Sequence, residues 1–377
     1  MTTTQPKRTS LDQRGRAGLQ FLGSLQVFSS GPLLEAVREE FDEQPEAAAL
    51  TEEFAQDVTD PEVWRDRLDR AREVAERSVG YRMNRLYQRY VAEENWVRSI
   101  EGVERRREAF EAEVSTMRQP VDEGKLQLDP DLQPPEYYEG VEWHLQPGGL
   151  DSYDLSGPMA YAGFLPHVFM RGGFAAVAVN DDIMAQRVAV IDQFRKPTYR
   201  RLYDAGSGGA GTLSLLHRKF PDAELVSGDM SAQSLRNGLR MSQAMGIDME
   251  FRQEDARATR EPDNSVDGVI TYALHHEMPP EVSLQVFQEM FRILEPGGDI
   301  VISDPPPFRA VPPLQAVMLD WETDNRAEPY FTDAGIANLA QMLRDVGFED
   351  VEEYALQDTH YPWVTRGRKP ASADTGR

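Results

Sequence analysis

The chain has 377 residues, of which 40% are hydrophobic and 28% charged, a composition typical of a water-soluble protein with two or three domains. Its formal net charge of −24 at pH 7 repels nucleic-acid phosphates and anionic lipids, so we expect neither nucleic acid nor a membrane as a partner. Because the sequence contains no cysteine, disulfides, thiol nucleophiles and cysteine-ligated metal sites are excluded.

The first 15 residues are small, polar and basic, and we expect them to be disordered. No apolar core of the signal-peptide type follows them, and no run approaches the roughly 18 apolar residues of a membrane span. We therefore expect a cytoplasmic protein.

Residues 16–135 are expected to form a helical N-terminal domain, because apolar side chains recur there at helical spacing. Asp60 before Pro61 is typical of a helix start, with Asp60 as the N-cap. Aromatic residues between 80 and 114 are typical of a core or a dimer interface. We expect this domain to cover the active site and to form a homodimer. Its last part, 119–136, is rich in Pro, Asp and Gln and is expected to be a linker.

Residues 136–198 are aromatic and glycine-rich, and they end in a predicted helix over 181–196. This connector either folds over a cofactor and shapes a substrate pocket, or packs as an ordinary interdomain linker, and the sequence leaves both open. On the first interpretation we expect Tyr161 to contact the cofactor. Three further residues of the connector are expected to contact substrate, namely Trp143, His144 and His167.

From residue 199 to 368, apolar strands alternate with helices, which predicts an α/β, doubly wound parallel sheet covered on both faces. Strands are expected over 202–205, 224–227, 249–253, 266–272, 299–303, 351–355 and 361–365. Helices are expected over 212–219, 232–245, 280–294 and 333–346. The tail, 369–377, is expected to be disordered.

A glycine-dense turn follows the first of these strands. Gly206-x-Gly208-x-x-Gly211 matches the dinucleotide-binding pattern, in which bare main chain and a helix N-terminus hold a nucleotide. Asp229, at the end of the next strand, is placed to accept hydrogen bonds from ribose hydroxyls. The pattern alone does not separate a nicotinamide cofactor from S-adenosylmethionine.

Two further motifs distinguish between a nicotinamide cofactor and S-adenosylmethionine. Asp255 follows the third strand, and Leu-Glu-Pro-Gly-Gly over 294–298 precedes the fifth. With these motifs in order, the region from Tyr199 resembles the class I S-adenosylmethionine-dependent methyltransferases, although the loop departs from their pattern at Ala210. The resemblance implies a Rossmann-like sheet of seven strands and S-adenosylmethionine as cofactor. The residues it implies for cofactor binding are Asp204, Gly206, Ser207, Gly208, Asp229, Met230, Asp255, Ala256 and Tyr272.

Methyl transfer to a hydroxyl or a protonated amine requires a base. The segment 274–279 resembles the loop of plant-type small-molecule O-methyltransferases, whose base histidine matches His276, and His275 is a weaker candidate. Many class I methyltransferases have histidines here without using them as bases. Trp321 and Asn325 follow the fifth strand, where insertions of this family form part of the acceptor pocket, but this stretch also fits a solvated loop. We expect no metal site, because His275, His276 and Glu277 are consecutive and match no standard ligand spacing.

The predicted function is methyl transfer from S-adenosylmethionine to an O, N or C atom of a small molecule. Secondary metabolism is one context in which we expect this reaction. The first alternative is a nicotinamide-dependent oxidoreductase that uses the same glycine loop. The second is a non-catalytic scaffold that keeps the fold without the reaction.

Overall fold

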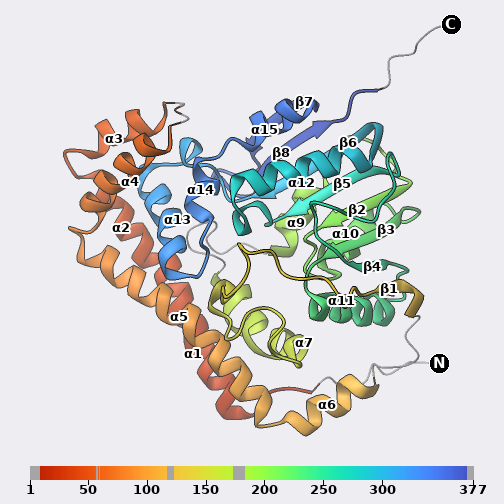
Figure 1. The fold of residues 1–377 in the computed structure, drawn as a ribbon. Coiled ribbons are helices and arrows are strands. Elements are labelled where there is room, and N and C mark those ends of the chain that lie inside the picture. Colours follow the sequence, from red (N-terminus) through yellow and green to blue (C-terminus); the bar gives the residue numbers. More distant parts are fainter. Residues whose placement is uncertain (1–8, 57, 59, 117–122, 173–182, 372–377) are drawn as a thin grey trace, which may run out of the picture.

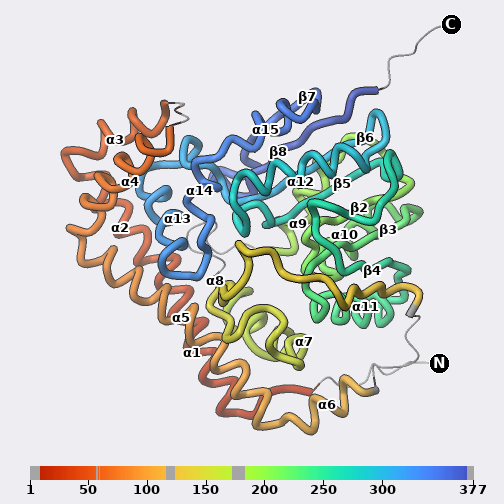
Figure 2. The backbone as a smooth tube through the Cα atoms, in the orientation of Figure 1, coloured from red at the N-terminus to blue at the C-terminus, as the bar shows by residue number. Residues whose placement is uncertain are grey.

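A computed structural model describes residues 9–56, 58, 60–116, 123–172 and 183–371 (Figures 1 and 2). The expected disorder of residues 1–8 and 372–377 lies outside the described residues. The fold combines one large sheet with helices on both of its faces and a group of long N-terminal helices to one side (Figure 1).

The sheet has eight strands in the order β1-β4-β3-β2-β5-β6-β8-β7. All pairings from β1 to β6 are parallel, and β8 runs antiparallel to both β6 and β7. The strands are β1 (Leu126–Gln127), β2 (Arg201–Ala205), β3 (Glu224–Asp229), β4 (Glu250–Gln253), β5 (Val266–Tyr272), β6 (Leu294–Asp304), β7 (Glu349–Ala355) and β8 (Trp363–Arg368). The doubly wound sheet is thus confirmed, with seven strands in the region from residue 199 and one more from the expected linker.

Two apolar layers explain why the central strands are continuous hydrophobic runs. One layer joins the sheet to α9 (Ile183–Ile191), α10 (Gly211–Lys219) and α11 (Ala232–Met245). The other joins it to α12 (Pro280–Ile293) and α15 (Leu339–Val346). Every residue of β5 is buried, as expected for a parallel strand covered on both faces.

The N-terminal region is helical, as predicted. Its helices are α1 (Gln13–Ser30), α2 (Pro32–Asp42), α3 (Ala47–Phe54), α4 (Pro61–Ala75), α5 (Val79–Glu104) and α6 (Arg107–Thr116). The side chain of Asp60 accepts a hydrogen bond from the N–H of Glu62, which confirms the predicted N-cap of α4. The expected disorder does not extend to residues 9–15, because Asp12 caps α1 and Leu11 is buried.

The connector contributes short helical elements between the N-terminal helices and the sheet. They are η2 (Trp143–Leu145), α7 (Ser156–Pro158), the π-helix η3 (Met159–Phe169) and α8 (Met170–Gly172), and η1 (Glu123–Lys125) precedes them in the expected linker. No helix among the described residues is both long and apolar enough to cross a bilayer.

One prediction of local structure after β6 is wrong, since the helix expected over 333–346 is divided into α14 (Phe331–Ile336) and α15. The stretch that starts at Trp321, for which a solvated loop was one of two alternatives, begins in the helix α13 (Pro313–Asn325). Short 3-10 turns, η4 (His275–Glu277) and η5 (Phe308–Ala310), follow β5 and β6.

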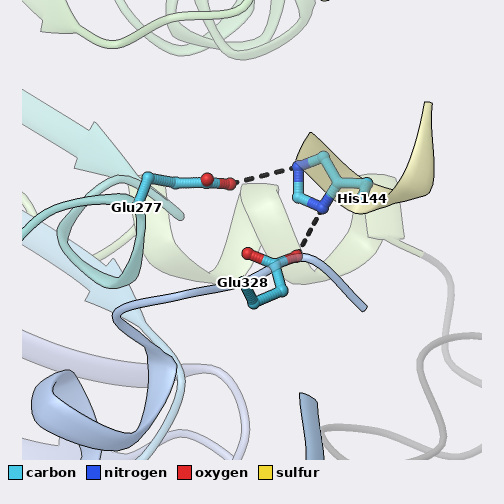
Figure 3. Close-up of side chains that lie close together, drawn as sticks. All are labelled: His144, Glu277 and Glu328. Atoms are coloured by element: carbon cyan, nitrogen blue, oxygen red, sulfur yellow. Dashed lines mark ion pairs between the residues drawn. The ribbon is translucent and has the colours of Figure 1, made fainter. Parts of the chain in front are cut away.

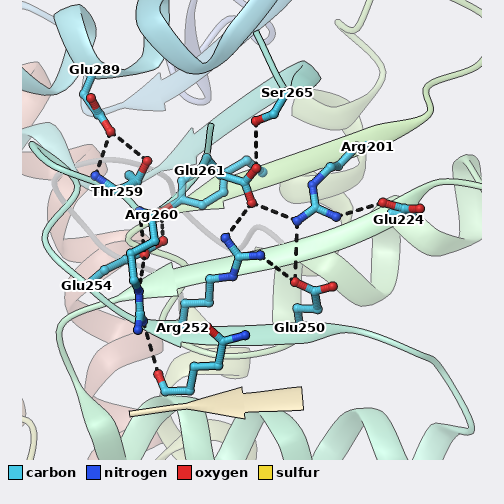
Figure 4. A network of polar contacts seen from close by, with 12 residues as sticks. Arg201, Glu224, Glu250, Arg252, Glu254, Thr259, Arg260, Glu261, Ser265 and Glu289 are labelled. Atoms are coloured by element: carbon cyan, nitrogen blue, oxygen red, sulfur yellow. Dashed lines mark hydrogen bonds and ion pairs between the residues drawn. The ribbon is translucent and has the colours of Figure 1, made fainter. Parts of the chain in front are cut away.

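A network of ion pairs joins the amino ends of β2, β3 and β4 (Figure 4). At its centre, the carboxylate of Glu261 lies 2.8 Å from Arg201 and 2.7 Å from Arg252, with its side chain only 1% exposed. Burial alone would raise the pKa of Glu261, but the hydrogen bonds from Arg201 and Ser265 keep it below its ordinary value.

We expect Glu261→Gln to destabilise the fold by about 3 kcal/mol, because it removes the most buried carboxylate that Arg201 and Arg252 share and leaves them with Glu250, which is 30% exposed. The matched change Glu224→Gln should cost less than about 0.5 kcal/mol, since Glu224 pairs with the same Arg201 but is 65% exposed. Urea unfolding of both variants measures the difference. Equal effects would show that Glu261 is not the centre of the network.

Candidate active site

A glycine turn at the carboxyl end of β2 forms the base of the site. Gly206 and Gly208 have φ of +66° and +60°, a region that side chains disfavour. A Cβ on Gly206 would lie 2.4 Å from a methyl carbon of Leu274, whereas a Cβ on Gly208 would meet no atom within 4 Å. The turn therefore presents bare main chain to open space, as the expected binding of a nucleotide-like ligand requires.

Asp204, the last residue but one of the same strand, has a carboxylate that is fully buried. Neither of its oxygens has a hydrogen-bond partner among the described residues. Burial raises the pKa of Asp204 to about 8, against the smaller effect of the positive charge of Arg187. A buried, unpaired acid beside an open glycine turn fits a ligand that brings a hydrogen-bond donor or a positive group.

Asp229, at the end of β3, links the glycine turn to the start of the next helix. One of its carboxylate oxygens accepts from the N–H of Gly208 at 2.8 Å, and the other accepts from the N–H of Ser231 at 2.7 Å. Each oxygen keeps a lone pair, so the carboxylate can still accept from two hydroxyl groups of a ligand. Burial raises the pKa of Asp229.

Ser207 and Met230 contribute to the shape of the turn. The hydroxyl of Ser207 lies 2.5 Å from that of Ser227 and accepts from the N–H of Gly209. The carbonyl of Met230 accepts from the side chain of Gln253. These contacts join residues of the chain to one another and stabilise the conformation of the turn.

Asp255 follows β4, as predicted, and both of its oxygens accept hydrogen bonds from Arg257 at 2.6–3.1 Å. The guanidinium of Arg257 also lies 5.7 Å from the ring of Tyr137. Ala256 packs, partly buried, against the apolar layer under α12. Asp255 can still accept from a ligand, but it does so as one half of an ion pair.

The connector lies along this edge of the sheet. Burial raises the pKa of Tyr138, and the negative charges of Asp229 and Glu277 raise it further. Its ring lies 5.0 Å from that of Trp143, which is 1% exposed and lies 6.4 Å from the ring of Tyr330. Trp143 is therefore the buried member of an aromatic cluster with Tyr138 and Tyr330, which we call the aromatic cover.

His275 and His276 have different environments. His275 is 1% exposed, its ring nitrogens contact the hydroxyls of Thr271 and Ser283, and burial lowers its pKa to about 4. For His276, burial alone would lower the pKa, but the adjacent carboxylate of Asp304, 2.6 Å from Nδ1, raises it to about 9. Asp304 also accepts from the N–H groups of residues 274–276 and so fixes this turn to the end of β6.

His144 lies between two carboxylates from distant parts of the chain (Figure 3). Its Nδ1 is 2.5 Å from Glu328 and its Nε2 is 3.1 Å from Glu277. Burial alone would lower the pKa of His144, but the two carboxylates raise it well above its ordinary value. Burial also raises the pKa of Glu328, which is 4% exposed, while His144 holds that of Glu277 below its usual range.

His144, Glu277 and Glu328 also offer three ligand-type atoms within 4.8 Å of one another. The two imidazole nitrogens, however, face different carboxylates, which is the geometry of an imidazolium that bridges two acids. The arrangement therefore brings acid–base groups together and does not require a metal ion. Glu277 is also 3.6 Å from Nε2 of His276, so these groups form one continuous cluster.

Four predicted contacts lie elsewhere. The hydroxyl of Tyr161 donates to Glu113 at 2.7 Å in the helical region, and burial together with the charges of Arg16 and Arg171 lowers the pKa of His167. The structure does not bring either residue to the sheet edge.

Trp321 and Asn325 lie where α13 packs on α5. The ring of Trp321 faces the guanidinium of Arg85 at 4.8 Å, and the side chain of Asn325 accepts from Arg89. Both residues hold these two helices together.

The sequence analysis missed Arg187 and Glu328. The guanidinium of Arg187 lies 4.2 Å from the centre of the Tyr272 ring and donates to Thr212 at the start of α10. Tyr272 itself accepts from the hydroxyl of Tyr361 at 3.1 Å. No motif marks Arg187 or Glu328, since only the fold brings them to the end of the sheet.

Comparisons with known proteins agree with this geometry. Residues 202–298 match a family model described as a methyltransferase domain. The chain is 29% identical over 122 residues to demethylmenaquinone methyltransferase of Thermus thermophilus, a match that covers 32% of this chain and 54% of that protein. It is 27% identical over 206 residues to a ubiquinone/menaquinone biosynthesis C-methyltransferase of Desulfotalea psychrophila, covering 47% and 81%.

Among solved structures, the methyltransferase SibL in its apo form is similar, with 20% identity, a TM-score of 0.40 and coverage of 50% of this chain and 55% of that one. The chain thus spans about half the length of the first of these curated relatives.

Proposed function

We propose that this chain, whose residues 202–298 form a class I S-adenosylmethionine-dependent methyltransferase domain, transfers a methyl group from that cofactor to an O, N or C atom of a small-molecule acceptor. The observation that carries the proposal is the buried, unpaired carboxylate of Asp204 beside the open main chain of Gly206 and Gly208. This combination fits the amino-acid end of the cofactor better than it fits an ordinary strand-to-helix turn.

Three acids of the sheet edge would hold the cofactor. Asp204 would orient the amino-acid end through water or main chain, Asp229 would accept from the ribose hydroxyls through its remaining lone pairs, and Asp255 would accept from the adenine amine. When bound, the cofactor supplies an electrophilic methyl group. The aromatic cover of Tyr138, Trp143 and Tyr330 would exclude water from it.

The cluster around His144 would face the acceptor. We assign His144 and Glu277 to orienting the acceptor's reacting group, since the side chain of His144 is 34% exposed and that of Glu277 18%. His276 remains the proposed base. Because its pKa is raised to about 9, it carries a proton near neutral pH and must release it before it can accept one from the acceptor. A positively charged ligand bound nearby would lower the pKa of His276 and so favour the release of its proton.

The small size of the acceptor is supported by the named relatives, one of which by its name methylates demethylmenaquinone. A net charge of −24 also disfavours a nucleic-acid acceptor. We also propose that this methyl transfer belongs to secondary metabolism.

The test is thermal unfolding with S-adenosylhomocysteine and, separately, with NAD. At 100 times its Kd, S-adenosylhomocysteine should raise the melting temperature by about 5 °C or more, and NAD should leave it unchanged. Stabilisation by NAD alone would establish the oxidoreductase alternative instead.

Asp229→Ala should weaken S-adenosylhomocysteine binding about 100-fold, because it removes two acceptors for hydroxyl groups and loosens the N–H of Gly208. The exposed Asp222→Ala is the matched control and should bind like the parent protein. Titration calorimetry compares the variants, and unchanged binding by Asp229→Ala would refute the assignment of the site. Tight binding with no methylated product from any acceptor would favour the scaffold alternative.

A further inference from the structure

A buried carboxylate oxygen without a partner lies in the cluster around His144. Glu328 is only 4% exposed, and one of its oxygens is 2.5 Å from Nδ1 of His144. Its second oxygen, Oε2, has no hydrogen-bond partner among the residues that the structure describes. Figure 3 shows this oxygen turned away from the imidazole, on the side where Glu277 lies. A buried oxygen of this kind needs a hydrogen-bond donor, and a ligand that brings one fits the position.

The charges of this cluster are unbalanced. It contains three carboxylates and two imidazoles, namely Glu277, Asp304, Glu328, His144 and His276. The charges that most affect the pKa of Glu328 come from within this group, from His144, Glu277 and His276. With every group ionised, the cluster therefore carries one negative charge in excess, which a cationic ligand would balance.

The reacting form of the acceptor distinguishes nitrogen from oxygen and carbon. A hydroxyl or an acidic C–H group must lose its proton to become a strong nucleophile, and it then brings a negative charge next to three carboxylates. An ammonium group that loses one proton becomes a neutral amine, which still has N–H groups to donate to Glu328. The excess negative charge of the cluster therefore disfavours an oxygen or carbon acceptor and favours a nitrogen acceptor.

We propose that the acceptor is an amine, which binds in its ammonium form with one N–H directed at the free oxygen of Glu328. This inference rests on the proposed function, because it concerns the acceptor of the same methyl transfer. Glu277, whose side chain is 18% exposed, offers a second carboxylate to the same ammonium group. The imidazole of His144 lies between these two carboxylates and holds both of them in place.

The proton of the ammonium group leaves through His276. The positive charge of the bound ammonium lowers the pKa of His276, which releases its own proton to solvent. Its Nδ1 is bonded to Asp304, so its Nε2 then takes one proton from the ammonium. The nitrogen lone pair forms the bond to the methyl carbon, the C–S bond breaks, and the electron pair of that bond stays on sulfur. Positive charge thus moves from sulfur to nitrogen, where the carboxylates of Glu277 and Glu328 stabilise it.

Titration calorimetry on the protein saturated with S-adenosylhomocysteine tests the charge of the acceptor. Three probes share a phenyl ring and differ in charge: phenethylamine is a cation, phenethyl alcohol is neutral and hydrocinnamate is an anion. Phenethylamine should bind at least about 10-fold more tightly than either of the others, because only its head group makes charge-assisted hydrogen bonds to the carboxylates. Equal or tighter binding of another probe, or no binding of phenethylamine, would overturn the proposal. A protein that does not bind S-adenosylhomocysteine would instead refute the proposed function.

Glu328→Gln tests the residue that receives the ammonium. It should weaken phenethylamine binding about 10-fold and change the Kd of S-adenosylhomocysteine less than about threefold, which also shows that the variant is folded. Glu277→Gln is the second variant and should give the same two results. The matched control Glu281→Gln removes an exposed carboxylate of α12 whose charge also acts on Tyr330, and it should bind phenethylamine like the parent protein. Unchanged phenethylamine binding by both Glu328→Gln and Glu277→Gln would overturn the proposal.

The reaction product and the effect of metal ions are measured with the same probe. With S-adenosylmethionine in place of S-adenosylhomocysteine, mass spectrometry should find N-methylphenethylamine. Phenethylamine that binds but is never methylated would show that the amine is not the acceptor and would overturn the proposal. All titrations contain EDTA, and phenethylamine binding that requires added Mg²⁺ would assign the free oxygen of Glu328 to a metal ion and would overturn the proposal as well.

Discussion

Asp204→Asn is expected to stabilise the cofactor-free protein above pH 5 and to weaken S-adenosylhomocysteine binding by about 10- to 100-fold. Both effects have one cause, because the carboxylate of Asp204 is fully buried and has no hydrogen-bond partner among the residues that the structure describes. Burial raises its pKa from 3.8 to about 8. An amide at this position has no charge to bury, but it holds the amino-acid end of the cofactor less strongly.

The pH dependence of stability follows from that shift. The folded protein keeps the proton of Asp204 up to about pH 8, whereas the unfolded chain releases it near pH 4. The stability that depends on this proton is therefore fully present below about pH 4 and is lost as the pH rises toward 8. The loss is on the order of 6 kcal/mol at most.

Urea unfolding between pH 5 and pH 9 measures this effect. The parent protein should lose stability across the range, and Asp204→Asn should show a smaller slope. The exposed Asp222→Asn should have the slope of the parent protein. An unchanged slope in Asp204→Asn would show that the proton is held elsewhere, and unchanged ligand affinity would remove Asp204 from the site.

The meeting of these acids at one edge of the sheet could be predicted from the sequence, because they lie at the ends of strands. Asp204 is the last residue but one of β2 and Asp229 is the last of β3, and parallel strands bring their carboxyl ends to the same edge of a sheet. The same rule applies to Asp304 at the end of β6, which the sequence analysis did not use. Its role became visible only when its hydrogen bonds to His276 and the preceding turn were known.

The acceptor side depends on contacts that no local pattern records. His144, Glu277 and Glu328 come from the connector, the turn after β5 and the segment between α13 and α14. Each residue alone is an ordinary polar residue in a loop or a turn. Only the tertiary fold makes them one cluster, so sequence reasoning selected His144 but found neither of its partners.

The sequence did not reveal α13 for a different reason. Its charged residues left a solvated loop open as an alternative, yet Asp320 and Glu322 are buried because Arg72 and Arg326 neutralise them. The helix has buried residues around most of its circumference, so it lacks the one-sided apolar stripe by which a surface helix is recognised. Paired charges in the interior therefore concealed both the helix and its packing role.

His144→Gln is expected to lower kcat/KM about 100-fold while changing the Kd of S-adenosylhomocysteine less than about threefold. His144 contacts Glu277 and Glu328 but makes no ion pair with Asp204 or Asp229. A neutral amide cannot offset two nearby carboxylates, so the variant should also lose about 2 kcal/mol of stability. The imidazolium stabilises the fold below its raised pKa, and that contribution disappears as the pH rises through it. Steady-state kinetics, titration calorimetry and urea unfolding give the three values.

The double variant His144→Gln/Glu328→Gln separates stability from catalysis. Removing the charge of Glu328, whose second carboxylate oxygen is buried without a partner, should restore most of the lost stability. Under the proposed role of His144 in orienting the acceptor, the rate should stay low, because its positive charge is still missing. His217→Gln, on α10, is the matched control and should leave both quantities unchanged. Recovery of rate together with stability would mean that His144 only holds the fold together and that the acceptor meets other groups.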